Sequence, residues 1–177
     1  NIRPDEVRAI LKEVFDKMGT KKRVLALPPD FTRLNSYAGP ITEMVYDYFG
    51  DALTDVMPAL GTHVAMTRQE AHSFFGDSVP YEKLIVHNWR TDVEKIGEVP
   101  ADFVASVSEG LVDTAIDVEV NRRLLDPTYD LIVSIGQVVP HEVVGMANYS
   151  KNIFVGCGGA SMINASHMLG AFYGLER

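Results

Sequence analysis

The sequence predicts an α/β fold, with a layered and mostly parallel sheet flanked by helices. Short, nearly continuous apolar runs, such as residues 24–27 and 129–135, are typical of strands that are buried on both faces. Segments with the 3.6-residue periodicity of helices alternate with these runs, which is the element order of α/β proteins. A chain of 177 residues, of which 46% are hydrophobic and 23% are charged, has the size and composition of one globular domain. We therefore expect a single α/β domain over residues 1–177.

The first two elements are a helix and a strand. Apolar residues recur every three or four positions over residues 4–18, with Pro4 in the first turn and Gly19 just past the end, as in an amphipathic helix. Residues 24–27 are all apolar, and two prolines follow them. Because proline cannot donate a ladder hydrogen bond, this strand is expected to end there.

A helix, a strand and a second helix follow. A proline opens the helix predicted for residues 40–53, and residues 55–60 return as a strand. Thr67, with Glu70 three positions later, is a capping-box signature. It predicts a helix that continues through Phe75.

The second half of the chain is read mainly as strands, with one helix at the end. Strands are expected at residues 84–86, 106–107, 116–118, 129–135 and 152–155. The run at residues 129–135 has the strongest strand character, because it is rich in β-branched and aromatic residues. After the last strand, the glycine-rich residues 156–159 lead into a helix that holds His167.

Charge and cysteine content exclude several classes of function. Sixteen basic residues against 24 acidic residues give a net charge of −8, which repels nucleic-acid backbones and anionic membrane surfaces. The single Cys157 cannot form an internal disulfide, and no apolar run approaches the length of a membrane span. We expect a cytoplasmic protein. The chain begins at Asn1 without methionine and stops at Arg177 after a helical pattern, so we also expect it to be a piece of a longer protein.

Polar segments follow several of the predicted strands. In open α/β sheets, ligands bind at the carboxyl ends of the strands, where such loops converge. Four segments meet this description: residues 30–33, 61–63, 140–151 and 156–167. We expect the functional site at their convergence.

Three histidines lie in these segments, namely His63, His141 and His167. Imidazole titrates near neutral pH, so two of them can act as base and acid, and a third can ligate nickel or zinc. Each can also be a hydrogen-bonded structural residue. Their shared position at strand ends favours a functional role.

Two cationic residues and a glycine run complete the candidates. Arg33 can form a surface ion pair with Asp30 or, inside a pocket, bind a substrate carboxylate through its planar fork. Lys151 is either a solvated residue or a nucleophilic or anchoring amine. The glycines of residues 156–159 can cradle a phosphate at a helix N-terminus, although no known phosphate-loop pattern is present. Cys157 among them is more typical of a packed residue than of a nucleophile.

At these residues the sequence resembles the N-terminal domain of the nickel-dependent lactate racemase family, as a distant member. The family's Asp-x-Thr-Arg motif is found at residues 30–33 and its Gly-Thr-His motif at residues 61–63. Its Pro-His followed ten residues later by lysine corresponds to residues 140–151, and its later nickel-ligating histidine falls on His167. The Gly-Gly-Arg that precedes the lysine in established lactate racemases is replaced here by Asn-Tyr-Ser at residues 148–150.

The resemblance implies a racemase or epimerase of a 2-hydroxy acid that acts by hydride transfer to a nickel-pincer nucleotide. This cofactor is attached to Lys151 through a thioamide, and His167 ligates its nickel. His63 and His141 are the implied acid/bases, one for each enantiomer. Arg33 is implied to bind the substrate carboxylate, with Asp30 supporting the site.

The same resemblance implies partners. Dedicated maturation proteins supply the cofactor, so recombinant protein made without them is expected to lack it. A second, C-terminal domain is expected to close over the site, and residues 1–177 alone are expected to be inactive.

Two other readings stay open at this point. One is a zinc-dependent α/β hydrolase that uses His63, His141 and His167 as ligands. The other is a non-catalytic module that binds an anion or a nucleotide in the same pocket.

Overall fold

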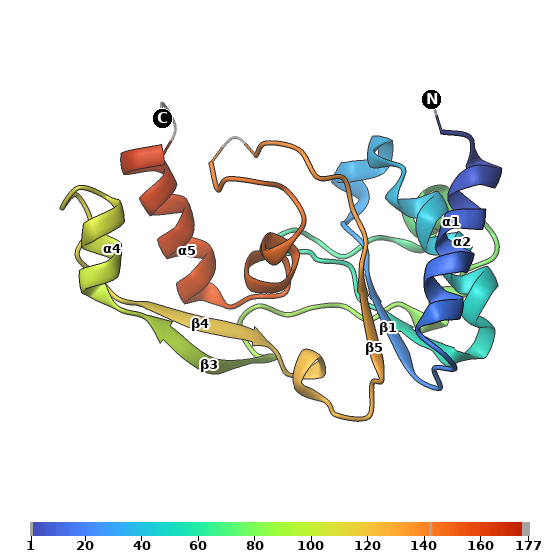
Figure 1. The fold of residues 1–177 in the computed structure, drawn as a ribbon. Coiled ribbons are helices and arrows are strands. Elements are labelled where there is room, and N and C mark those ends of the chain that lie inside the picture. Colours follow the sequence, from blue (N-terminus) through green and yellow to red (C-terminus); the bar gives the residue numbers. More distant parts are fainter. Residues whose placement is uncertain (1, 142, 175–177) are drawn as a thin grey trace.

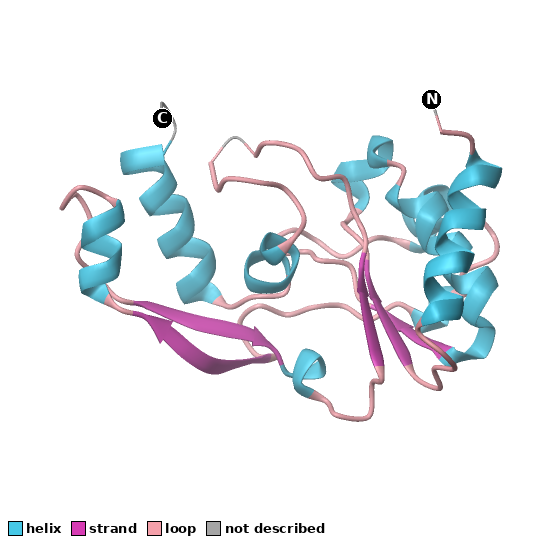
Figure 2. Ribbon diagram, viewed as in Figure 1, coloured by secondary structure: helices cyan, strands magenta, loops and turns pink. Residues whose placement is uncertain are grey.

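A computed structural model describes residues 2–141 and 143–174, and it confirms the predicted fold class (Figures 1 and 2). The helices are α1 (Pro4–Lys17), α2 (Ala38–Phe49), α3 (Arg68–Phe75), α4 (Ala101–Val107) and α5 (Ala160–Leu169). The strands are β1 (Val24–Leu27), β2 (Leu53–Val56), β3 (Val93–Val99), β4 (Ile116–Asn121) and β5 (Leu131–Ser134). Short π-helical turns occupy Asn152–Gly156 and Gly170–Gly174.

A three-stranded parallel sheet forms the centre, in the order β2-β1-β5. All four residues of β1 are buried, as its uninterrupted apolar sequence predicts. Val24 and Ala26 face one hydrophobic core, and Leu25 and Leu27 face the other. The strand therefore joins two layers of the molecule.

Helices α1, α2 and α3 supply the first of these cores. In Figure 1, α1 and α2 lie together on one side of the sheet. Phe15, Val45 and Phe74 pack there against the strands. The predicted capping box starts α3, since the Glu70 amide donates to Thr67 Oγ1 at 3.2 Å and the Glu70 carboxylate accepts from the Thr67 amide at 2.8 Å.

A two-stranded antiparallel sheet of β3 and β4 lies beyond the other side of the parallel sheet, next to α4 and α5 (Figure 1). The amide of Asn121, at the end of β4, donates to the carbonyl of Cys157 at 2.8 Å, and Val120 forms an isolated bridge with Gly158. The two-stranded sheet is thus hydrogen-bonded to the segment that leads into α5.

Two predicted strands are wrong. Residues 106–107 belong to α4, which follows Pro100 and carries Asp102 in its first turn. Residues 152–155 form a π-helical turn, in which the amide of Cys157 donates to the carbonyl of Asn152 at 2.9 Å.

Other predicted boundaries shift. Helix α2 ends at Phe49, and β2 takes up Leu53–Val56 rather than residues 55–60. Past the end of β2, the amides of Met57 and Ala59 still donate to the carbonyls of Ala26 and Pro28, at 2.9 and 2.8 Å. Residues 84–86 contribute only a single bridge, between Leu84 and Val56. In the part of the chain that the structure describes, no helix is both long and apolar enough for a membrane span.

Candidate active site

Asp30 and His63 form a hydrogen-bonded pair at the carboxyl ends of β1 and β2. The Asp30 carboxylate is buried, with 4% of the residue exposed, and it accepts a hydrogen bond from His63 Nδ1. Its other oxygen accepts from the backbone amide of Thr32 at 2.8 Å. Because Nδ1 carries the proton, Nε2 of a neutral His63 ring is the basic nitrogen.

Local structure places both side chains. Asp30 is the N-cap of the 3₁₀ helix Phe31–Ser36, which turns the chain at the end of β1. The loop of His63 begins at Gly61, whose φ of +55° is a left-handed conformation that glycine adopts without strain. The amide of Gly61 donates to the carbonyl of Gly156 at 2.8 Å, which links this loop to the segment that carries Lys151.

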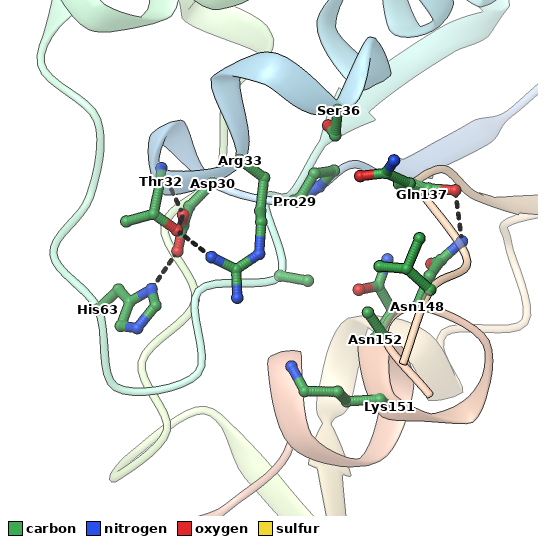
Figure 3. Close-up of a pocket in the computed structure, with 14 residues that line it drawn as sticks. Pro29, Asp30, Thr32, Arg33, Ser36, His63, Gln137, Asn148, Lys151 and Asn152 are labelled. Carbon is green, nitrogen blue, oxygen red and sulfur yellow. Dashed lines mark hydrogen bonds and ion pairs between the residues drawn. The ribbon is translucent and has the colours of Figure 1, made fainter. Parts of the chain in front are cut away.

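A polar cavity of about 80 Å³ opens beside this pair. Arg33 and Lys151 both reach into it, from opposite sides (Figure 3). The remaining lining residues are Pro29, Asp30, Thr32, Ser36, Ala59, His63, Gly136, Gln137, Val139, Ala147, Asn148 and Asn152. Two cationic side chains together with hydroxyl and amide groups are suited to a small carboxylate that bears a hydroxyl.

The ion pair between Arg33 and Asp30 is not formed. Asp30 pairs with His63 instead, and the hydrogen bond that Arg33 makes is a long one of 3.5 Å to Thr32 Oγ1. No carboxylate among the described residues forms a salt bridge with the Arg33 guanidinium. Its fork is therefore available to an incoming anion.

A second, mainly apolar cavity of about 520 Å³ adjoins Lys151 on α5's side. Its volume is in the range of ligand sites in general. Its lining residues are Val144, Met146, Tyr149, Ser150, Lys151, Phe154, Val155, Met162 and Ser166. Lys151 thus stands at the junction of a polar and an apolar cavity.

His141 and His167 lie next to each other, with ring centroids 6.3 Å apart and planes at 90°. His167 Nδ1 donates to the carbonyl of Ile163 at 2.7 Å, so its Nε2 has a free lone pair for a metal. His141 Nδ1 accepts from the amides of Val143 and Val144, which puts the proton of the neutral ring on Nε2.

The structure therefore divides the predicted residues into two groups. Asp30, Arg33, His63 and Lys151 share the polar cavity, whereas His141 and His167 are not among its lining residues. Over residues 2–141 and 143–174, no three His, Cys, Asp or Glu side chains are grouped to hold a metal ion. The three-histidine zinc site considered from the sequence is not formed.

The glycine run before α5 is closely packed. A Cβ on Gly158 would lie 1.9 Å from the carbonyl oxygen of Phe154, and one on Gly159 would lie 2.1 Å from Glu119 Oε2. The same Glu119 oxygen accepts from the amide of Ser161 at 3.3 Å, in the first turn of α5. A carboxylate therefore stands where the sequence suggested a phosphate.

Sequence reasoning missed several lining residues, including Ser36, Gln137 and Asn152. Of these residues, Asn152 could have been identified from the sequence, since it is a polar residue at the start of an apolar run next to Lys151. Two further residues, Cys157 and His87, are structural. Cys157 is fully buried, and burial raises the pKa of its thiol to about 12. His87 is buried against Asn121 and Gly158, and burial lowers its pKa.

Two proteins of known structure are similar to this chain. A protein from Thermotoga maritima of known crystal structure is 24% identical, with a TM-score of 0.84, over 97% of this chain and 42% of that one. The lactate racemase apoprotein from Thermoanaerobacterium thermosaccharolyticum is 21% identical, with a TM-score of 0.69, over 93% of this chain and 39% of that one. At such identities the two structures show a shared fold, and this chain spans less than half the length of either.

A search among curated proteins found no match. A family model described as the lactate racemase N-terminal domain, in contrast, matches residues 8–174. That match covers nearly the whole described structure, including every residue of the polar cavity. The chain belongs to the lactate racemase N-terminal domain family.

Proposed function

We propose that this chain is the cofactor-bearing part of a racemase or epimerase of a 2-hydroxy acid. The observation that carries the proposal is the Asp30–His63 pair, which borders the same cavity as Arg33 and Lys151. A base, a carboxylate-binding fork and an anchoring amine are the groups that such a reaction needs.

The reaction proceeds through a 2-keto acid. Arg33 binds the substrate carboxylate through its guanidinium fork. His63 Nε2 accepts the hydroxyl proton as the 2-hydroxy acid is oxidised to the 2-keto acid, and the cofactor, when bound, would accept the α-hydrogen as a hydride. Asp30 holds the His63 ring in the required tautomer and stabilises the imidazolium that forms.

The second enantiomer requires an acid on the other side of the substrate. We assign this role to His141, whose loop also contributes Val139 and Ala147 to the cavity. Its Nε2–H donates a proton to the carbonyl oxygen as the hydride returns to the opposite face. Two histidines then serve the two enantiomers in both directions.

The residues fit the nickel-pincer nucleotide implied by the family. Lys151 provides the amine for attachment, the apolar cavity beside it suits a planar ring, and His167 Nε2 is left free for nickel by the bond of Nδ1 to Ile163. When bound, this cofactor supplies a hydride acceptor and donor. Maturation proteins and a second domain that excludes water are part of the proposal, as is a cytoplasmic location.

The test is to produce the intact protein together with cofactor-maturation enzymes. Nickel content, the mass of the peptide that contains Lys151, and interconversion of D- and L-hydroxy acids are then measured. We expect nickel, an added mass on Lys151 and racemisation. Unmodified Lys151 without nickel, under conditions that load a known lactate racemase, would refute the proposal.

Single variants test the assignment of the two histidines. His63→Ala and His141→Ala should each abolish most of the turnover, whereas His72→Ala, at an exposed position on α3, serves as the control. Racemisation at the parent rate by both of the first two variants contradicts the assignment. Binding of a hydroxy acid without turnover, in fully loaded protein, would indicate a non-catalytic binding module instead.

A further inference from the structure

Lys151 lies in the segment of residues 148–152. The side chains at the two ends of this segment are both hydrogen-bonded to a third polar side chain, that of Ser134. The Ser134 hydroxyl donates to Asn148 Oδ1 at 3.1 Å and accepts from Asn152 Nδ2 at 3.3 Å. Asn148 Nδ2 also donates to the carbonyl of Gly136 at 3.0 Å. We call Asn148, Ser134 and Asn152 the asparagine clamp.

Asn152 attaches the clamp to the sheet. Only 8% of this residue is exposed, and its side-chain nitrogen Nδ2 lies 3.2 Å from the carbonyl oxygen of Leu27 and 3.3 Å from that of Ile135. These carbonyls mark the carboxyl ends of β1 and β5. The residue directly after Lys151 is therefore fixed to two neighbouring strands.

Asn148 holds the other side. Its φ is +60° and that of Tyr149 is +51°, so two successive residues adopt the left-handed conformation. Asparagine tolerates this conformation better than most residues, and a tyrosine there is strained. The strain persists because the side-chain amide of Asn148 is hydrogen-bonded to Ser134, at the end of β5, and to Gly136 just after it.

We propose that the asparagine clamp positions Lys151, by fixing the backbone three residues before and one residue after it. The clamp keeps the amine at the junction of the two cavities, of which Figure 3 shows the polar one. The functional part of this inference rests on the proposed function, in which Lys151 carries the cofactor. The structural part does not, because it concerns the mobility of Lys151 in protein without cofactor.

The first test measures amine reactivity without cofactor. Ser134→Ala removes the bridging hydroxyl, and Asn148→Gly removes the amide while it relieves the left-handed conformation. Each variant loses two hydrogen bonds of the clamp. In pulse acetylation followed by peptide mass spectrometry, both variants should label Lys151 about fivefold faster, which corresponds to a net loss of about 1 kcal/mol against local opening. Lys83, which is half-buried and donates to the carbonyl of Leu53 at 2.8 Å, should be unaffected.

Ser106→Ala is the matched control, since it removes a hydroxyl bonded to the carbonyl of Phe103 on the distant helix α4. Parent-like labelling of Lys151 in both clamp variants overturns the proposal. Equal acceleration at Lys83 also counts against it, because that result indicates general loosening of the fold.

The second test uses protein made with maturation enzymes. The fraction of Lys151 that carries the cofactor should fall in Ser134→Ala and Asn148→Gly relative to Ser106→Ala, at unchanged melting temperature. Loading equal to that of the parent overturns the positioning role. If the parent itself carries no cofactor, the proposed function fails, while the labelling experiment still decides whether the clamp restrains Lys151.

Discussion

The carboxylate of Asp30 accepts a hydrogen bond from Nδ1 of His63, across 33 positions of sequence. The two residues come from loops that follow neighbouring parallel strands, β1 and β2. Asp30 is almost completely buried, whereas about half of the His63 side chain is exposed. A buried anion thus fixes a ring whose other nitrogen remains accessible, which is the arrangement of a histidine that works as a general base.

Replacing Asp30 with asparagine should impair catalysis more than folding. The amide is nearly isosteric, but it does not hold the His63 ring in the same tautomer or stabilise its cation. We expect kcat of the loaded enzyme to fall by about 10²-fold or more, by analogy with the loss of up to about 10⁴-fold in serine proteases. Asp113→Asn, at an exposed position, is the control. Unchanged kcat in Asp30→Asn would show that the pair has no catalytic role.

The convergence of Asp30, Arg33, His63 and Lys151 could be predicted from the sequence because it follows from topology. Parallel strands bring their carboxyl ends to one edge, so polar residues after those strands meet there. The start of α3 was equally predictable, since the Thr67 capping box is a local signal.

Other features depend on contacts that no local pattern contains. Residues 152–155 have the composition of a strand, yet the bonds of Asn152 to Leu27 and Ile135 hold them in a π-helical turn. The sequence left open whether Arg33 pairs with Asp30, whereas the fold brings His63 to that carboxylate. Both features depend on contacts between residues that are far apart in the sequence.

Gly158 should not tolerate alanine, because its Cβ would lie 1.9 Å from the carbonyl oxygen of Phe154. The backbone must shift to relieve this overlap, and we expect a loss of about 3 kcal/mol in the free energy of unfolding. Gly97→Ala is the matched control, since nothing lies within 4 Å of a Cβ there. Urea denaturation measures both variants. Equal stability of the two would mean that the packing of Gly158 is looser than the structure indicates.

Arg33→Lys should lower kcat/KM mainly through a higher KM. Lysine retains the charge but loses the planar fork that matches a carboxylate with two hydrogen bonds. We expect an increase in KM of about tenfold, which corresponds to one lost charge-assisted hydrogen bond. Steady-state kinetics of the loaded enzyme with a hydroxy acid provide the measurement. A fall in kcat at constant KM would place Arg33 in the chemical step instead.

The thiol of Cys157 should be inert in the folded protein. It is fully buried, and a pKa of about 12 leaves only about one thiol in 10⁴ ionised at pH 8. Ellman's reagent should therefore react with it only after unfolding in guanidinium chloride. Rapid stoichiometric reaction in native buffer would contradict the packing described for the segment before α5.

His87 should make the folded state sensitive to acid. Its Nε2–H donates to the carbonyl of Gly158 at 3.0 Å, and its Nδ1 accepts from Asn121 Nδ2 at 2.9 Å, an arrangement that requires the neutral ring. The orientation of the Asn121 amide is fixed, because its oxygen accepts from the Arg123 amide. Protonation of His87 would place a hydrogen on Nδ1, so that this nitrogen and Asn121 Nδ2 would both be donors and their hydrogen bond would be lost.

Burial lowers the pKa of His87 below its usual value of 6.5, although the hydrogen bond to Gly158 and the charge of Asp92 act in the opposite direction. Above pH 6.5, His87 is neutral in both the folded and the unfolded chain and adds no pH dependence. Below that pH, the unfolded chain binds the proton first, so the free energy of unfolding falls until the folded pKa is passed.

The variant His87→Gln separates this titration from other acid effects. Glutamine can still donate to the Gly158 carbonyl, but it does not ionise. Urea midpoints between pH 6.5 and about 5 should therefore fall less steeply in His87→Gln than in the parent. His72→Gln, at an exposed position, should keep the parent slope. If His87→Gln loses stability as steeply as the parent over this range, protonation of His87 is not what weakens the contact between β4 and the segment before α5.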